Sequence, residues 1–78
     1  MKIKATTLLR LVSLGEARVT YRLEIQWTEG ESWVDIGTMR MGELEYDLTM
    51  SLMALGARRA GVDFTMEDKT AWQSLAQK

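Results

Sequence analysis

Residues 19–27 alternate strictly between apolar and polar side chains. Val19, Tyr21, Leu23, Ile25 and Trp27 are apolar, and the residues between them are Thr, Arg, Glu and Gln. A period of two is typical of a β-strand that has one buried face and one face in water. One such strand cannot bury its apolar face alone, so the chain must supply a sheet and a second layer to cover it.

The segment before this strand predicts its partner in a β-hairpin. Ile3, Ala5, Leu9 and Leu11 share one parity, and mostly polar residues share the other. A hairpin that places both apolar sets on one face needs a loop with an odd number of residues. Residues 14–16, Leu-Gly-Glu, supply three, including a glycine that can adopt positive φ.

A third strand is predicted after a polar turn at residues 28–32, and it runs from Trp33 to about Arg40. Two arrangements of its side chains are open. In one, Trp33 and Met39 both point away from the core. In the other, a bulge at Gly37 reverses the direction of Met39.

Residues 43 to about 60 change to a helical pattern. Acidic residues occupy the first turns, and Arg58 and Arg59 lie in the last turn, where they complement the helix dipole. Gly61 is a natural C-terminal stop. Further on, Thr65 and Asp68 have the spacing of a capping box, which predicts a short final helix over about 66–77.

The main helix carries two apolar stripes on roughly opposite sides: Leu44, Leu48, Leu52 and Leu55 form one, and Tyr46, Met50, Met53, Ala57 and Ala60 form the other. One sheet cannot cover both. In the first interpretation, the leucines pack on the sheet and the final helix covers Tyr46, Met50 and Met53. In the second, the final helix covers only part of that stripe, and the flexible methionines contact another chain.

Together these patterns predict a single small α+β domain over residues 1–78. Its expected architecture is a three-stranded antiparallel β-meander packed on one main helix, followed by a short C-terminal helix, in the order β-β-β-α-α. With 78 residues and no cysteine, the chain lies near the size at which a single core barely offsets conformational entropy. Tight packing or self-association is therefore expected to supply additional stability.

The chain contains no histidine and no cysteine. These residues are the usual general base near neutral pH, the usual nucleophilic thiol and the commonest soft metal ligands. The sequence also lacks the nucleophile elbow of hydrolases and the glycine-rich motifs that bind phosphates or dinucleotides. We therefore expect no enzymatic activity, no metal and no cofactor.

Charge is distributed unevenly along the chain. Residues 1–28 hold five basic and two acidic residues, whereas residues 29–48 hold six acidic residues against Arg40 alone. The net charge of -1 gives no global attraction to nucleic acid or to anionic membranes. An acidic strip next to apolar side chains is suited to a protein partner with a basic surface.

We predict a non-catalytic protein-binding module that acts as an inhibitor, an adaptor or an assembly factor. The candidate binding residues are Glu29, Glu31, Trp33, Asp35, Met39, Tyr46, Met50 and Met53. The expected partners are another protein with a basic surface and, for self-association, a second copy of the chain. In general character, being small, acidic-patched and free of cysteine, the chain resembles accessory proteins of phages and mobile elements, including anti-CRISPR inhibitors.

The alternative function is binding of nucleic acid by the open face of the N-terminal hairpin. Basic side chains there would neutralise phosphates while Trp33 stacks on a base. Glu24 on the same face and the acidic turn beside it oppose this alternative. The candidate residues are Lys2, Lys4, Arg10, Arg18 and Arg22.

The N-terminus superficially resembles a signal peptide, with two lysines before an apolar run. Arg10 interrupts the run, and Glu16 stands where cleavage requires small neutral residues. No stretch approaches the roughly 20 apolar residues of a membrane span. We therefore expect a cytoplasmic protein that does not enter the membrane.

Overall fold

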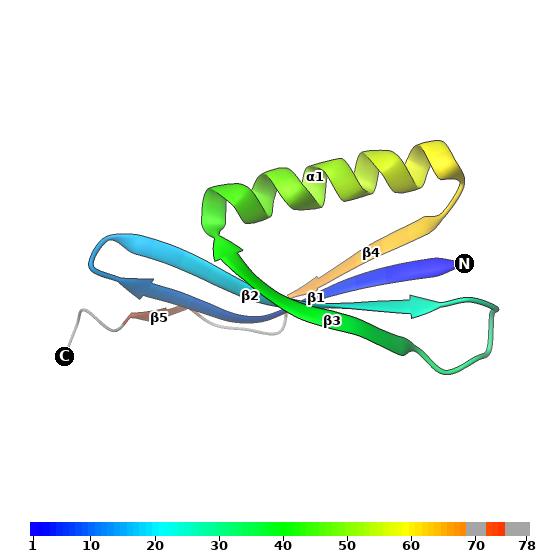
Figure 1. Cartoon of the computed structure of the whole chain (residues 1–78), viewed down its shortest axis with the longest axis horizontal. Helices are drawn as coiled ribbons and strands as arrows, with labels where there is room; N and C mark the ends of the chain where they lie inside the picture. Colours follow the sequence, from blue (N-terminus) through cyan, green and yellow to red (C-terminus); the bar gives the residue numbers. More distant parts are fainter. Residues whose placement is uncertain (69–71, 75–78) are drawn as a thin grey trace.

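A computed structural model of the chain describes residues 1–68 and 72–74. These residues form a mixed β-sheet with one helix across one of its faces (Figure 1). The strands pair in the order β3-β2-β1-β4, and β5 also pairs with β1. The elements are β1 (Lys2–Ser13), β2 (Glu16–Gln26), β3 (Val34–Gly42), α1 (Glu43–Ala60), β4 (Asp63–Asp68) and β5 (Trp72–Ser74). The chain is therefore α+β, and the predicted antiparallel arrangement of β1, β2 and β3 is confirmed.

The hairpin between β1 and β2 turns through two residues rather than three. Ser13 pairs with Glu16, and between them Leu14 has a φ of 53° and Gly15 a φ of 81°. Positive φ at both central residues is the conformation that matches the right-handed twist of a two-residue hairpin. The predicted loop of three residues, 14–16, is therefore wrong.

A bulge in β1 replaces the odd-numbered loop. Thr7 pairs with Tyr21, but the next pair is Leu9 with Thr20, so Leu8 is an extra residue. The bulge reverses the side-chain parity of the strand, so Leu9 and Leu11 lie on the opposite face from Ile3 and Ala5. The prediction that these four residues share one face is therefore wrong. Arg10, which pairs with the fully buried Val19, lies on the helix side instead.

A second bulge fixes the direction of the β3 side chains. Leu23 pairs with Gly37, whereas Glu24 pairs with Asp35, so Ile36 is the extra residue. Gly37 has a φ of 154°, a conformation that other residues rarely adopt. Beyond the bulge, Met39 pairs with Tyr21 and faces the helix. Of the two arrangements left open by the sequence, the one with a bulge at Gly37 is confirmed.

The predicted C-terminal helix is wrong for the residues that are described. Residues 63–68 form β4 and residues 72–74 form β5, and both strands run parallel to β1. The remainder of the predicted helix, 69–71 and 75–78, lies outside the described residues. Phe64 and Met66 alternate with polar residues, and this period of two outweighs the isolated spacing of a capping box.

Helix α1 joins two strands that run in the same direction. β3 is antiparallel to β2 and β2 is antiparallel to β1, so β3 runs parallel to β1 and to β4. A connection between parallel strands must cross a face of the sheet, and α1 makes that crossing. The helix ends as predicted at Gly61, which has a φ of 71°, and Val62 N–H donates to the Ala57 carbonyl oxygen at 2.9 Å.

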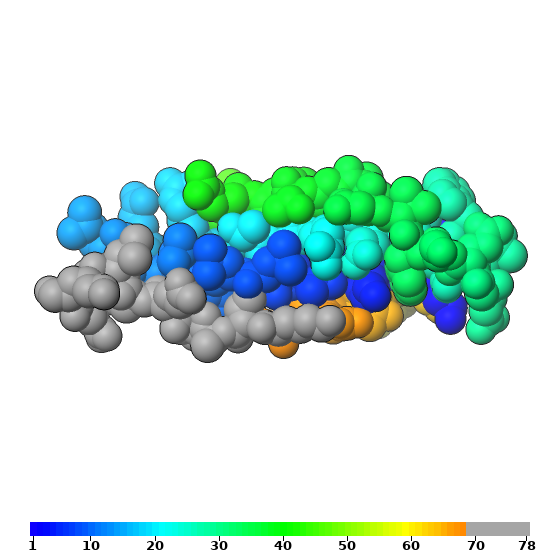
Figure 2. Space-filling model, turned by 90° about the horizontal axis from the view of Figure 1, so that it is seen from below, coloured from blue at the N-terminus to red at the C-terminus, as the bar shows by residue number. Residues whose placement is uncertain are grey.

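The core is small and lies between α1 and the centre of the sheet. Its buried cluster contains Ala5, Val19, Tyr21, Tyr46 and Met50. The molecule measures 46 × 24 × 16 Å and has a radius of gyration of 14.1 Å, against about 11.5 Å for a compact domain of this length. The opposite sheet face, seen in Figure 2, is crossed by β3, β2, β1 and β4 side by side. An elongated two-layer molecule of this size leaves much apolar surface outside its core.

Candidate protein-binding surface

The outward side of α1 carries a row of exposed leucines. The exposed fractions are 83% for Leu44, 61% for Leu48, 59% for Leu52 and 46% for Leu55. Their spacings of four, four and three residues place them on one side of a helix, one above the other. We call these four residues the leucine row. The first sequence interpretation, which packed this stripe on the sheet, is therefore wrong.

The inward side of α1 carries the second stripe. Tyr46 and Met50 are each 3% exposed. The ring of Tyr46 packs edge-on against that of Tyr21, with 5.5 Å between centroids and 62° between planes. The Tyr46 hydroxyl forms a buried hydrogen bond of 2.6 Å with Thr7 Oγ1. This bond satisfies both polar groups in the core, so the tyrosine side can lie inward without an unpaired hydroxyl.

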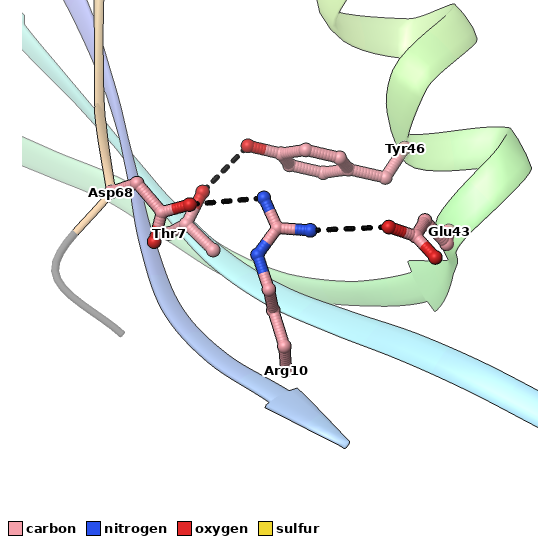
Figure 3. A network of polar contacts seen from close by, with 5 residues as sticks. All are labelled: Thr7, Arg10, Glu43, Tyr46 and Asp68. Atoms are coloured by element: carbon pink, nitrogen blue, oxygen red, sulfur yellow. Dashed lines mark hydrogen bonds and ion pairs between the residues drawn. The ribbon is translucent and has the colours of Figure 1, made fainter. Parts of the chain in front are cut away.

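Arg10 ties the start of α1 to two strands (Figure 3). Its Nη1 atom lies 3.4 Å from Glu43 Oε1, and its Nη2 atom donates to Asp68 Oδ2 at 3.1 Å. The guanidinium carbon is 5.5 Å from the centre of the Tyr46 ring. The bulge at Leu8 points Arg10 at these partners, so an irregularity in β1 helps to fix which side of α1 faces the sheet.

Tyr21 lies beneath the inward side of α1 and donates from its hydroxyl to Met39 Sδ at 3.5 Å. Burial, reinforced by the neighbouring Tyr46, raises the pKa of Tyr21 above its usual value of 10.0. Tyr21 is therefore neutral at physiological pH. Its contacts are those of a residue that stabilises the fold.

Charged residues lie near both ends of the leucine row. Glu45 and Asp47 are exposed beside its N-terminal half, and Arg58 and Arg59 are exposed at its C-terminal end. Within the described part of the chain, the ion pairs at α1 involve Glu43 and none of these four residues. The outward side of the helix thus has an apolar centre, an acidic end and a basic end.

The acidic residues that the sequence assigned to binding lie away from the outward side of α1. Glu29, Glu31 and Asp35 are exposed in and after the connection between β2 and β3. Trp33 is half-buried, and Lys4 Nζ lies 4.4 Å from its ring centre. Asp35 pairs with Glu24 on the sheet face away from the helix. This acidic group is separated by the sheet from the methionines that were predicted to act with it.

The other predicted binding residues belong to the helix side of the sheet. Met39 and Met53 are partly buried against the core cluster, of which Tyr46 and Met50 are members. With exposed fractions of 3%, Tyr46 and Met50 offer almost no surface to a partner. The interpretation in which the methionines contact another chain is therefore replaced by one in which the leucine row is free to do so.

Each of the five basic residues in the nucleic-acid alternative has a carboxylate within 4.0 Å. The pairs are Lys2 with Glu29, Lys4 with Glu67, Arg10 with Glu43 and Asp68, Arg18 with Glu16, and Arg22 with Glu24. Arg10 also lies on the helix side, whereas Arg18 and Arg22 lie on the other face. The structure does not gather these five residues into one unpaired basic surface.

A cavity of about 280 Å³ opens near the C-terminal end of α1. Ile3, Met53, Ala57 and Phe64 contribute to its walls. These side chains are apolar and bring no acid, base or nucleophile to the cavity. Among the described residues, no group of three or more acidic side chains is placed to hold a metal ion, and no helix combines the length and hydropathy needed to cross a bilayer.

No family model, curated protein or solved structure matches this chain. The candidate surface therefore rests on the geometry of the chain itself. The leucine row is the candidate feature that the sequence interpretation missed, although both stripes were visible. One signal was present: at 100° per residue, Arg59 lies within about 20° of Leu48 in projection. A charged residue in line with an apolar stripe indicates that the stripe faces outward.

Proposed function

We propose that this protein is a non-catalytic protein-binding module and that the outward side of α1 is its binding surface. The observation that carries the proposal is the leucine row, whose four members are 46–83% exposed along one side of a single helix. An inhibitor, an adaptor or an assembly factor would each need such a surface. The same helix completes the core with its other side, so its position is fixed before a partner binds.

The physical argument is the cost of leaving this row in water. Burial of apolar surface contributes about 25 cal/mol per Å², or about 1.5–3 kcal/mol for a leucine that passes from full exposure to full burial. Single exposed leucines are common, but four in a continuous row are typical of an interaction surface. An amphipathic partner helix is the natural complement of a row with helical spacing.

The charges beside the row define the partner further. Glu45 and Asp47 favour basic groups opposite the N-terminal half of α1, in line with the predicted partner that has a basic surface. Arg58 and Arg59 favour acidic groups opposite its C-terminal end. Nucleic acid is the weaker candidate, because the basic residues that would bind it already pair with carboxylates.

Site-specific photo-crosslinking tests the proposal. A photoreactive amino acid replaces Leu48, and the full chain is irradiated in a lysate of its source organism. We expect a discrete protein adduct, either with the chain itself or with another protein. The matched control carries the same amino acid in place of Thr38, which is exposed on β3 and lies on the opposite sheet face.

An adduct at position 48 and none at position 38 supports the proposal. If neither position gives an adduct, or if both give the same diffuse pattern, the outward side of α1 is not the binding surface. Circular dichroism of both substituted chains checks that the fold is retained.

A further inference from the structure

We infer that the partner of the leucine row is α1 of a second copy, packed antiparallel to the first about a twofold axis near Leu52. This inference rests on the proposed function, since it identifies the partner of the same surface. The row spans residues 44–55, which is about 16 Å of helix. It is therefore long enough to receive the matching row of another copy and is centred close to the middle of the 18-residue helix.

An axis at Leu52 brings three of the four leucines of each copy together. With the axis at Leu52, that residue meets its own equivalent, and Leu48 lies opposite Leu55 of the second copy. Leu44 then lies at the level of Ala60 of the second copy, beyond the end of the other row. A symmetric interface of this kind is self-complementary, because every contact occurs twice.

The same axis brings opposite charges together without further adjustment. In an antiparallel helix pair with twofold symmetry, each flank of a helix faces the same flank of its partner. Asp47 and Arg58 share one flank of the leucine row, so Asp47 of one copy faces Arg58 of the other. Glu45 lies on the other flank, and the axis brings it to the level of Arg59 of the second copy, which projects in line with the row. A parallel arrangement would instead place acid against acid and base against base.

Small residues beside the row permit close approach of the two helices. Ser51 lies on one flank and Gly56 on the other. A Cβ atom added at Gly56 would meet no atom within 4 Å, so packing within one chain does not require glycine there. A glycine inside a helix costs about 1 kcal/mol relative to alanine. Packing within one chain gives no reason for a glycine at position 56. Close packing of a second helix against this position gives one.

A single helix pair buries less than the roughly 800 Å² per partner of a standard interface. We therefore expect a reversible dimer with a dissociation constant on the order of 10 µM. Sedimentation equilibrium of the full chain from about 1 to about 500 µM covers this range. The expected result is a shift from monomer to dimer with rising concentration, and a molar mass that stays at the monomer value throughout overturns the inference.

The leucine row is tested by Leu52→Gln, which changes the interface at its axis. We expect the dissociation constant to rise at least about tenfold, with an unchanged circular dichroism spectrum. The matched control is Leu14→Gln, because Leu14 is 90% exposed at the tip of the hairpin and lies outside the proposed interface. An equal effect of both substitutions, or no effect of Leu52→Gln, contradicts the assignment of this surface.

The helix orientation is tested by cross-linking single introduced cysteines. Because the natural chain contains no cysteine, only the introduced thiols react. Ser51→Cys lies near the axis and is expected to cross-link to itself with a short bis-maleimide. Glu45→Cys lies about 21 Å along the axis from its own equivalent, so it is expected to cross-link only when mixed with Arg59→Cys. Self-cross-linking of Glu45→Cys overturns the antiparallel arrangement. Because these substitutions are exposed, the test does not depend on disrupting the fold.

The two proposals fail in different ways. A chain that stays monomeric while position 48 cross-links to a different protein overturns the second-copy inference and leaves the proposed function supported. A chain that stays monomeric and gives no adduct overturns both.

Discussion

The two sides of α1 are both apolar and have opposite surroundings. The inward side, with Tyr46 and Met50, is buried against the sheet, whereas the outward side, with the leucine row, is in water. Leucine is a stronger hydrophobe than tyrosine, so hydrophobicity alone would place the leucines inside. The arrangement shows that specific polar contacts decide which side is core.

Those contacts are made by residues that only one side of the helix possesses. The hydrogen bond between Tyr46 and Thr7 and the interaction of Glu43 with Arg10 both hold the inward side against the sheet. The leucines have no such attachment and can meet any apolar surface. The inward side is thus specified by geometry within the chain, and the outward side is left for association.

The largest expected effect on the free energy of unfolding comes from placing a charge first on the inward side and then on the outward side of α1. Met50→Glu buries a carboxylate at a position that is 3% exposed, and we expect a loss of about 4 kcal/mol or more, enough to abolish cooperative folding. Leu52→Glu, at a position that is 59% exposed, should change the stability of the monomer by less than about 1 kcal/mol. Urea unfolding followed by circular dichroism measures both. Equal destabilisation by the two substitutions would make the leucine row part of the core.

The hydrogen bond of the inward side gives the next largest effect. Tyr46→Phe leaves the buried hydroxyl of Thr7 without this partner, and we expect a loss of about 1–3 kcal/mol in urea unfolding. Tyr21→Phe removes only a weak contact with Met39 Sδ at 3.5 Å and should cost less than about 1 kcal/mol. Adding Thr7→Val to Tyr46→Phe should restore much of the lost stability, since both polar partners are then replaced. Failure of this rescue would mean that the hydrogen bond does not orient the helix.

The sequence predicts the parts of this fold that depend on local pattern. The alternation at residues 19–27 predicted β2, and the change to helical spacing predicted α1 and its end at Gly61. The hairpin loop was missed because the bulge at Leu8 depends on pairing with β2 across the sheet. The final helix was predicted in error because the alternation of Phe64 and Met66 with polar residues is a short signal. The pairing that stabilises β4 is with β1, more than 50 residues earlier in the chain.

None of the four leucines of the candidate site was among the binding residues predicted from the sequence. The sequence revealed both apolar stripes of α1, but the choice between them depends on Thr7, which is 39 residues from Tyr46. The predicted acidic residues Glu29, Glu31 and Asp35 are exposed. Their supposed neighbours among the methionines turned out to lie across the sheet, because the bulge at Gly37 directs Met39 towards the helix.

The burial of Tyr21 beneath the inward side of α1 also predicts that the free energy of unfolding depends on pH. Because the pKa of Tyr21 is raised in the folded state, the unfolded chain loses this proton first as the pH rises. The contribution of Tyr21 to stability is therefore constant below about pH 10 and is lost as the pH rises through its folded-state pKa, with a slope of at most about 1.4 kcal/mol per pH unit. Urea unfolding of the wild type and Tyr21→Phe across this range isolates the effect. Parallel pH profiles for the two proteins would show that Tyr21 is not buried as described.

Gly56→Ala is expected to have the smallest effect on the free energy of unfolding. It distinguishes most clearly between a role in folding and a role in association. Alanine is the better helix former by about 1 kcal/mol, and its Cβ meets no atom within 4 Å, so the monomer should become more stable by about 0.5–1 kcal/mol in urea unfolding. The same methyl group lies beside the leucine row, where it should hold two packed helices apart and weaken the dimer in sedimentation equilibrium. Opposite signs in the two measurements require that Gly56 serves association rather than folding. A gain in both would leave the glycine unexplained and would place the second helix farther from this flank.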